Sequence, residues 1–278
     1  MIWEKTYQTI KFKKYVFSLL RGEFMIRGMY TAISSLITLE AKQGVVTNNL
    51  TNINTPGFKP DELIISQFDK VMLSNKDSSS KSFKNLGEMS IGSKIDSTIT
   101  KFTQGTLKQT EKITDFALNG PGFFTVTQGG QEYYTRDGSF IIDVQGNLIT
   151  SNGASVMGTN VNTGNYEPIN LAGATEVSVD SLNNINVNGV PVYKMRISNF
   201  GDYKNLKKIS DNLYSSEDNS FEMLTARVQN RVLEISEVDP AEEMVNLTNI
   251  LRSYESSMKV LNYLDDSLRI SANEIGKV

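Results

Sequence analysis

Candidate catalytic residues are scarce in this sequence. It contains no histidine and no cysteine, so the commonest general base, the commonest metal ligand and every thiolate nucleophile are absent. The remaining acid–base candidates are Asp115, Arg136, Asp137 and Asp143. Asp137 precedes a glycine, and Asp beside Gly is normally turn chemistry. We therefore expect no catalytic, cofactor or metal site, and no enzyme activity.

Two glycine-rich or acidic loops could in principle hold a ligand, but neither has the required residues. Gly120-Pro121-Gly122 is not followed by the Gly-Lys-Ser/Thr of a phosphate loop. Residues 143–147 lack the ligand count of a calcium loop. A net charge of −3 over 278 residues offers no basic field for nucleic acid. No apolar run reaches 18 residues, so we expect no direct membrane insertion.

The longest periodic pattern in the chain covers residues 239–278. Asp239 can cap a helix, Pro240 suits its first turn, and Glu242 completes a capping box. A helix of about 35 residues would be about 50 Å long. Asp265 interrupts its apolar seam. The seam is a heptad-like repeat of Met244, Leu247, Leu251, Tyr254, Met258, Leu261, Leu268, Ala272 and Ile275. A repeat of this length predicts a long partner helix.

A second long helix is predicted near the other end of the chain, from about Ile26 to Ile53. It must end before Thr55-Pro56, because the residue before proline avoids the α region. Gly44 is its weak point. We expect the two helices to pair as a coiled coil around a central, mainly antiparallel β domain, which makes the fold class α+β. The apolar face of the N-terminal helix comprises Ile26, Met29, Ile33, Leu36, Val46, Leu50 and Ile53.

Between the helices, turn signals recur about every ten residues, as in Asn119-Gly120, Asn152-Gly153 and Asn188-Gly189. β-rich segments separate them, which is typical of an antiparallel meander or sandwich. The expected organisation is a translated leader or amphipathic extension (1–24), an N-terminal assembly helix (25–59), a partly flexible linker or hairpin (60–94), a β-rich body (95–236) and a C-terminal assembly helix (237–278).

Four asparagines crowd the end of the first helix, namely Asn48, Asn49, Asn52 and Asn54. Asparagine is a mediocre helix former that favours turns and caps, so one interpretation is a fraying helix end. The other is a ladder of side-chain amides that bond to neighbouring copies, since asparagine at a helix interface can specify register and partner. The residues alone leave both interpretations open.

Several motifs resemble those of bacterial flagellar rod and hook proteins. They are Met25-Ile26-Arg27-Gly28-Met29-Tyr30, Asn48-Asn49-Leu50-Thr51-Asn52-Ile53-Asn54-Thr55-Pro56-Gly57-Phe58-Lys59, Asp115-Phe116-Ala117-Leu118-Asn119-Gly120-Pro121-Gly122-Phe123-Phe124, Tyr134-Thr135-Arg136-Asp137-Gly138-Ser139-Phe140, Val238-Asp239-Pro240-Ala241-Glu242-Glu243-Met244-Val245 and Arg252-Ser253-Tyr254-Glu255. Thr51 departs from the family's commoner alanine. The resemblance covers nearly all of residues 25–278.

The resemblance implies a structural subunit of the flagellar basal-body rod that polymerises helically through its terminal helices to form the drive shaft and export channel. Expected partners are copies of itself, other flagellar rod and hook proteins and the flagellar type III export apparatus. The expected location is the flagellum basal body, reached without a cleaved signal peptide. Both proximal and distal rod positions fit, and the short polar passage at 61–110 favours the proximal one. A secreted β-domain binding module or adhesin on a helical stalk is the alternative.

The residues expected at the interface between subunits come from the two helical seams and from the asparagine group. They are Met29, Ile33, Leu36, Asn48, Asn49, Leu50, Asn52, Met244, Leu247, Leu251, Tyr254, Met258, Leu261 and Leu268.

Overall fold

The computed structural model describes residues 2–68, 70–76, 83–210, 212–216, 221–222 and 226–275; for residues 2–26, 71, 73–76, 83–86, 222 and 275 it describes the backbone only. Met1 and residues 77–82, within the segments predicted as a leader and as a partly flexible hairpin, lie outside the described residues. The chain divides into two compact units. One comprises Met1–Thr47, Leu63–Thr98 and Met244–Val278, and the other comprises Asn48–Glu62 and Ile99–Glu243.

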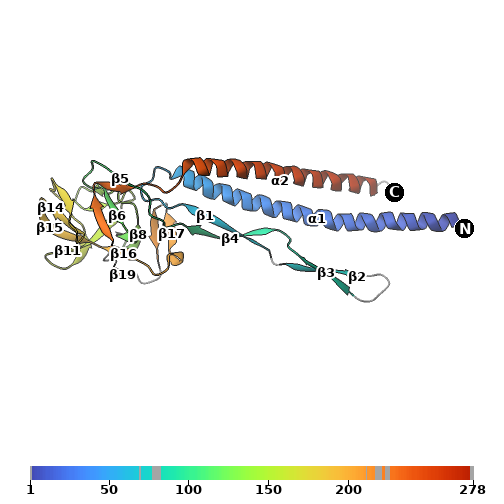
Figure 1. Ribbon diagram of the computed structural model, residues 1–278, viewed down its shortest axis with the longest axis horizontal. Helices are drawn as coiled ribbons and strands as arrows, with labels where there is room; N and C mark the ends of the chain where they lie inside the picture. Colours follow the sequence, from blue (N-terminus) through green and yellow to red (C-terminus); the bar gives the residue numbers. More distant parts are fainter. Residues whose placement is uncertain are drawn as a thin grey trace. The chain divides into compact units, whose positions relative to one another are not determined.

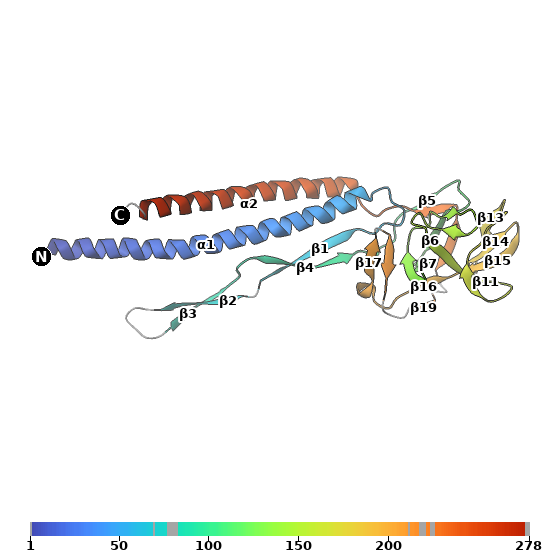
Figure 2. The ribbon, with the colours of Figure 1, turned by 180° about the vertical axis from the view of Figure 1, so that it is seen from behind.

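Two long helices carry most of the first unit. Helix α1 spans Ile2–Thr51 and helix α2 spans Pro240–Ile275, and Figures 1 and 2 show them side by side with opposite directions. Helix α2 has 36 residues, in agreement with its predicted length. Its cap is as predicted, because Asp239 Oδ1 accepts hydrogen bonds from the backbone N–H groups of Ala241 and Glu242. Helix α1 begins well before the start predicted near Ile26.

The predicted pairing of these helices as a coiled coil is wrong. In a coiled coil the seam side chains are buried as knobs in holes of the partner, but Ile33 is 40% exposed, Met244 59% and Leu251 43%. Within the described part of α2, the buried side chain is Ile250, which the heptad pattern did not include. Apolar periodicity therefore identified the helices correctly but did not identify their buried faces.

The heptad pattern missed the buried face of α1 because this helix packs against a β ribbon in the first unit. Strands β1 (Asp61–Gln67) and β4 (Ser93–Thr100) pair, and β2 (Val71–Lys76) pairs antiparallel with β3 (Phe83–Met89). Thr31 Oγ1 of α1 donates to the Ile91 carbonyl (3.1 Å), and Ser34 Oγ accepts from the Ser93 N–H (3.3 Å). Helix α1 thus packs small polar side chains on the ribbon, which a search for apolar heptads does not detect.

Gly44 offers a test of how strongly α1 depends on its own propensity. It lies in the helix interior, and a Cβ atom there would have no neighbour within 4 Å. Gly44→Ala should stabilise the helix by about 0.5–1 kcal/mol, because glycine loses more backbone entropy on folding than alanine. The check is the thermal midpoint of the helical circular dichroism signal of the full chain. A lower midpoint for the variant would contradict the expectation.

The second unit is built on a 13-stranded sheet in which every pairing is antiparallel. Its main path runs β13-β14-β15-β11-β7-β8-β18-β17, with β9, β10, β12, β16 and β19 attached beside it. The strands are β7 (Phe123–Gln128), β8 (Gln131–Thr135), β9 (Ile141–Ile142), β10 (Leu148–Ile149), β11 (Ser155–Asn160), β12 (Tyr166–Pro168), β13 (Val177–Val179), β14 (Asn184–Val187), β15 (Val190–Met195), β16 (Ile197–Asn199), β17 (Lys207–Ser210), β18 (Leu213–Ser215) and β19 (Phe221–Glu222).

Two small sheets and a short helix complete this unit. Strand β20 (Arg227–Asn230) pairs with β6 (Phe116–Asn119), and β21 (Val232–Glu234) pairs with β5 (Leu107–Gln109). The 3-10 helix η1 spans Tyr203–Asn205. Strands β20 and β21 are the last strands before the C-terminal helix α2.

Phenylalanines form much of the core of the second unit. Phe116, Phe124 and Phe140 are buried in one apolar cluster. Phe123 belongs to a second cluster with Tyr134, Phe200 and Tyr214. Successive side chains of a strand point to opposite faces, so Phe123 and Phe124 of β7 supply the two clusters from one strand.

Candidate functional site

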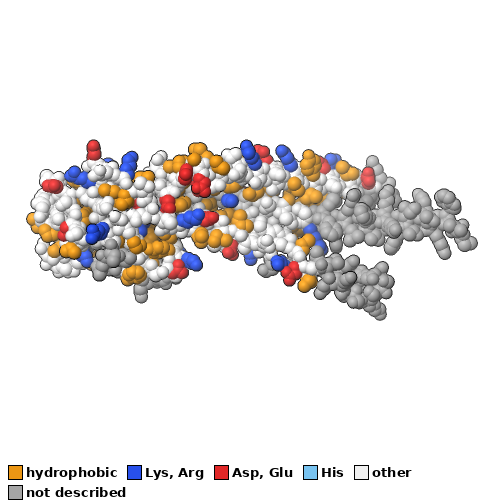
Figure 3. Space-filling model, in the orientation of Figure 1, with side chains coloured by type: hydrophobic (Ala, Val, Ile, Leu, Met, Phe, Trp, Pro, Cys, Tyr) orange, Lys and Arg blue, Asp and Glu red, His pale blue; other side chains and the backbone are white. Residues whose placement is uncertain are grey.

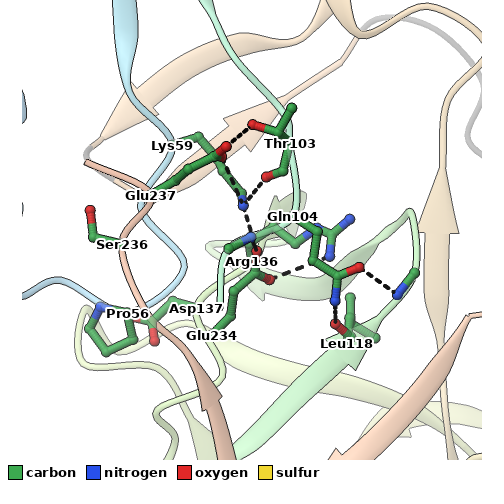
Figure 4. A network of polar contacts seen from close by, with 12 residues as sticks. Pro56, Lys59, Thr103, Gln104, Leu118, Arg136, Asp137, Glu234, Ser236 and Glu237 are labelled. Atoms are coloured by element: carbon green, nitrogen blue, oxygen red, sulfur yellow. Dashed lines mark hydrogen bonds and ion pairs between the residues drawn. The ribbon is translucent and has the colours of Figure 1, made fainter. Parts of the chain in front are cut away.

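A network of polar side chains lies in the second unit where four separated segments meet, and it consists of Lys59, Thr103, Arg136, Glu234 and Glu237 (Figure 4). We call it the polar junction. Lys59 Nζ lies 2.5 Å from Glu234 Oε1, and both side chains are 1% exposed. The Lys59 ammonium also donates to the Thr103 carbonyl. The neighbouring Gly105 N–H donates to the same Glu234 oxygen, at 2.8 Å.

The second Glu234 oxygen faces a second cation. Arg136 Nη1 lies 3.5 Å from Glu234 Oε2. Burial lowers the pKa of the Arg136 guanidinium, and the charge of Glu234 opposes that shift. Glu237 adds a second carboxylate, because its Oε2 is 3.9 Å from Lys59 Nζ and its Oε1 accepts from the Thr103 hydroxyl. Lys59, Arg136 and Glu234 are therefore buried together, and the half-buried Glu237 supplies the second negative charge that balances the two cations.

Glycine at position 57 lets the chain reach this junction. Gly57 has φ of +68°, and a Cβ atom there would lie 2.4 Å from the Arg136 carbonyl carbon. Its N–H donates to the Glu234 carbonyl at 2.7 Å. The next residues, Phe58 and Lys59, are buried. The Pro56-Gly57-Phe58-Lys59 turn therefore directs Lys59 towards Glu234 after the first helix ends.

The four acid–base candidates hold turns and ion pairs. Asp137 Oδ1 accepts from the Ser139 N–H at 2.9 Å, and burial raises the pKa of the Asp137 carboxyl. Asp143 Oδ1 accepts from the backbone N–H groups of two residues in the turn between β9 and β10, which is ordinary Asx-turn chemistry. Asp115 is buried at the bridge to Ser139. Arg136 pairs with Glu234 as described.

Across the described ranges, no group of three or more acidic side chains could hold a metal ion. Neither helix, over its described residues, is long and apolar enough to cross a membrane.

The asparagines at the end of α1 do not share one environment. Asn49 and Asn52 are buried, whereas Asn48 and Asn54 are exposed. Asn52 Nδ2 donates to the Asn48 carbonyl at 3.1 Å, and its Oδ1 accepts from the Thr55 hydroxyl at 3.0 Å. Asn52 therefore closes the end of the helix, and its amide is used inside the chain.

The other predicted interface residues fall into two groups. Ile33, Met244 and Leu251 are exposed. The remainder are half-buried, namely Met29, Leu36, Leu50, Leu247, Tyr254, Met258, Leu261 and Leu268. The helices also expose apolar side chains outside the heptad pattern, which are Tyr30 and Ile37 on α1 and Val245, Val260, Tyr263 and Ile270 on α2. Figure 3 shows such side chains along the upper edge, where α2 lies.

The polar junction could be predicted only in part. Lys59 and Arg136 stand in conspicuous motifs, but nothing near Glu234 marks it as their partner, 175 residues after Lys59. A charged residue within an otherwise apolar segment is the available signal, as in Val232-Leu233-Glu234-Ile235, because charges are buried when paired.

Comparison with known proteins places these features in a family. Three family descriptions match the chain: "Flagella basal body rod protein" over residues 29–59, "Flagellar hook protein FlgE/F/G D1 domain" over 117–189 and "Flagellar basal body rod FlgEFG protein C-terminal" over 229–274. The first match contains the turn that carries Lys59, and the third contains Glu234, Glu237 and nearly all of α2.

Relatives match along most of the chain. The flagellar basal-body rod protein FlgF of Caulobacter vibrioides is 30% identical over 258 residues, which covers 91% of this chain and all of the relative. The flagellar basal-body rod protein FlgG of Borreliella burgdorferi is 30% identical, covering 90% of this chain and 98% of the relative. The flagellar hook-basal body complex protein FlhO of Bacillus subtilis is 28% identical, covering 91% and 100%.

These matches confirm the resemblance seen in the sequence motifs. The expectation of a structural protein that is not an enzyme is confirmed as well, because the relatives are structural rod proteins. None of these relatives favours an adhesin or binding module. The chain belongs to the family of bacterial flagellar basal-body rod proteins and is a structural subunit of the rod.

Proposed function

We propose that the subunit polymerises helically through exposed faces of its terminal helices, with copies of itself and with other rod and hook proteins, into a drive shaft around the export channel. The observation that carries this proposal is the apolar exposure along α2, where Tyr263 is 74% exposed. Apolar side chains that stay exposed along one element point to a contact with a partner protein.

Helical spacing places three exposed apolar side chains of α2 on one line along the helix, which we call the stripe. At 3.6 residues per turn, Tyr263 lies five turns beyond Val245, and Ile270 follows about two turns later. These three exposed side chains therefore point in nearly the same direction. Leu247, Leu261 and their half-buried neighbours lie on a different face. One face of α2 is thus used within the subunit, and another remains available for a neighbour.

Burial of this stripe would supply part of the free energy of assembly, at about 25 cal/mol for each Å² of apolar surface removed from water. A contact between unlike faces of identical subunits that does not close into a ring builds a filament. The exposed seam residues Ile33, Met244 and Leu251 extend the proposed interface beyond the stripe. The half-buried seam residues and the asparagines at the end of α1 also belong to the proposed interface.

We also propose that the subunit reaches the basal body through the flagellar type III export apparatus, without a cleaved signal peptide, and occupies a proximal-type position in the rod. The resemblance to rod and hook proteins supports the export route, because such proteins leave the cell in that way. The short polar passage at 61–110 supports the proximal position.

A double substitution on the stripe tests the assembly proposal. Tyr263→Glu combined with Ile270→Glu should lower the amount of subunit in purified basal bodies and the motility of the cells, because each charge would be buried without a partner at the interface. Both positions are exposed in the subunit, so the folding of the purified chain should not change. The control is Val144→Glu, at a fully exposed valine of the second unit. Normal rods from the double variant would contradict the proposal.

A further inference from the structure

We infer that Asn49 is a positioning residue for rod assembly, because its side-chain amide joins the last turn of α1 to the first turn of α2 and to the first residue of β1. This inference rests on the proposed function, since it matters for assembly only if the terminal helices carry the contacts. Asn49 is 2% exposed although it lies at the end of a helix. Its neighbours Asn48 and Leu50 are not buried.

Every polar atom of the Asn49 side chain has a partner within the chain. Its Nδ2 donates to Glu243 Oε1 at 2.8 Å and to the Asp61 carbonyl at 3.0 Å. Its Oδ1 accepts from the Asp61 N–H at 3.1 Å. The amide thus occupies both backbone groups of Asp61, as a neighbouring strand would, and uses its second hydrogen for Glu243.

The chemistry of this position selects an amide of this length. A primary amide offers one acceptor and two donors, which matches one N–H, one carbonyl and one carboxylate. An aspartate would place a second acceptor against the Asp61 carbonyl and the Glu243 carboxylate, and buried acceptors that face each other are costly. A hydrogen bond to a charged group is stronger than a neutral one, so the Glu243 contact is the stronger of the two donations.

The partners are themselves fixed in place. Glu243 lies in the first turn of α2, where its N–H donates to the Asp239 carbonyl at 3.0 Å and its negative charge suits the helix N-terminus. Asp61 accepts from the Thr100 hydroxyl (2.7 Å) and pairs with Lys208 (2.9 Å). Asn49 therefore links the last turn of α1 to two anchored points, both of which lie with it in the second unit.

Asn49→Asp in the full-length chain should lower the amount of subunit in purified basal bodies roughly tenfold or more, because an unsatisfied buried polar pair shifts an equilibrium by about that factor. Adding Glu243→Gln should restore assembly to at least about threefold above the single variant, since the new amide can donate to the introduced carboxylate. If Asn49 only stabilised the fold, the assembly defect of Asn49→Asp would not be rescued by a substitution at Glu243, which is distant in the sequence.

Two controls isolate the contact. Glu242→Gln removes the same charge from the same turn at an exposed residue and should not rescue Asn49→Asp. Asn152→Asp makes the same amide-to-acid change at an exposed turn residue and should leave assembly unchanged. If Glu243→Gln rescues Asn49→Asp and Glu242→Gln does not, the inference is supported even if Asn49→Asp impairs folding. Normal assembly of Asn49→Asp, or no rescue by Glu243→Gln, would overturn it.

The outcome also separates this inference from the proposed function. If Tyr263→Glu with Ile270→Glu forms normal rods, the proposed function fails whatever Asn49→Asp does. If that double variant is defective but Asn49→Asp assembles normally or is not rescued, the role of Asn49 alone fails.

Discussion

Glu234→Gln should lower the free energy of unfolding of the second unit by about 3–5 kcal/mol, because removing one partner of a buried ion pair leaves uncompensated charge in the interior. The substitution keeps the shape of the side chain but leaves Lys59 and Arg136 facing a neutral amide. Lys59 is 1% exposed and cannot reach water without rearrangement. Glu237 lies 3.9 Å from Lys59 Nζ, which is too far to replace a contact of 2.5 Å.

The measurement is chemical denaturation of the purified full-length chain, followed by tyrosine signals of the second unit. A matched control is Glu62→Gln, because Glu62 pairs with Lys101 at 2.9 Å while both side chains are more than half exposed. A surface pair of this kind contributes about 0–1 kcal/mol. If the two variants lose the same stability, burial of the Glu234 pair is not what makes it important.

Gly138→Ala should destabilise the second unit by more than about 4 kcal/mol, which is the range of the severest single substitutions. A Cβ atom at this position would lie 1.6 Å from the Phe116 carbonyl oxygen. Both chains are held there, because the Phe116 N–H donates to the Gly138 carbonyl at 3.0 Å. Phe116 is fully buried on β6, so neither segment can move aside without disturbing the core.

Gly201→Ala is the matched control for this prediction. A Cβ atom at Gly201 would have no neighbour within 4 Å, and its φ lies outside the left-handed region. The same methyl group should therefore change the stability little. The prediction would be contradicted if Gly138→Ala were soluble and had a normal unfolding midpoint. The backbone of Phe116 on β6 would then be able to move away from the added methyl group.

The elements of this protein follow closely from local sequence. The cap at Asp239, the proline at position 240 and the long apolar repeat identify α2 almost residue by residue. The turn glycines divide the β body at the right places, since positive φ at Gly146, Gly153 and Gly189 is a local requirement that the residue type itself reveals. Local signals of this kind depend on neighbours in the chain, which the sequence displays.

The faces of the helices could not be predicted in the same way. Apolar periodicity marks the sides of a helix that carry apolar side chains, but it does not tell whether their partner is in the same subunit or in another. Helix α1 uses Thr31 and Ser34 against the ribbon, and hydroxyl groups of this kind look like solvent-facing residues in a sequence. The coiled coil was therefore predicted where the structure has a helix beside a ribbon.

The sequence by itself determined the family, the two long helices and the turns of the β body, because each depends on short motifs or on local backbone preference. Only the tertiary structure decided which residues meet. It brought Glu234 to Lys59 across 175 residues, buried Asn49 against Asp61 and Glu243, and left Tyr263 exposed. Contacts between distant segments are decided by how the whole chain packs, and neither composition nor period records them.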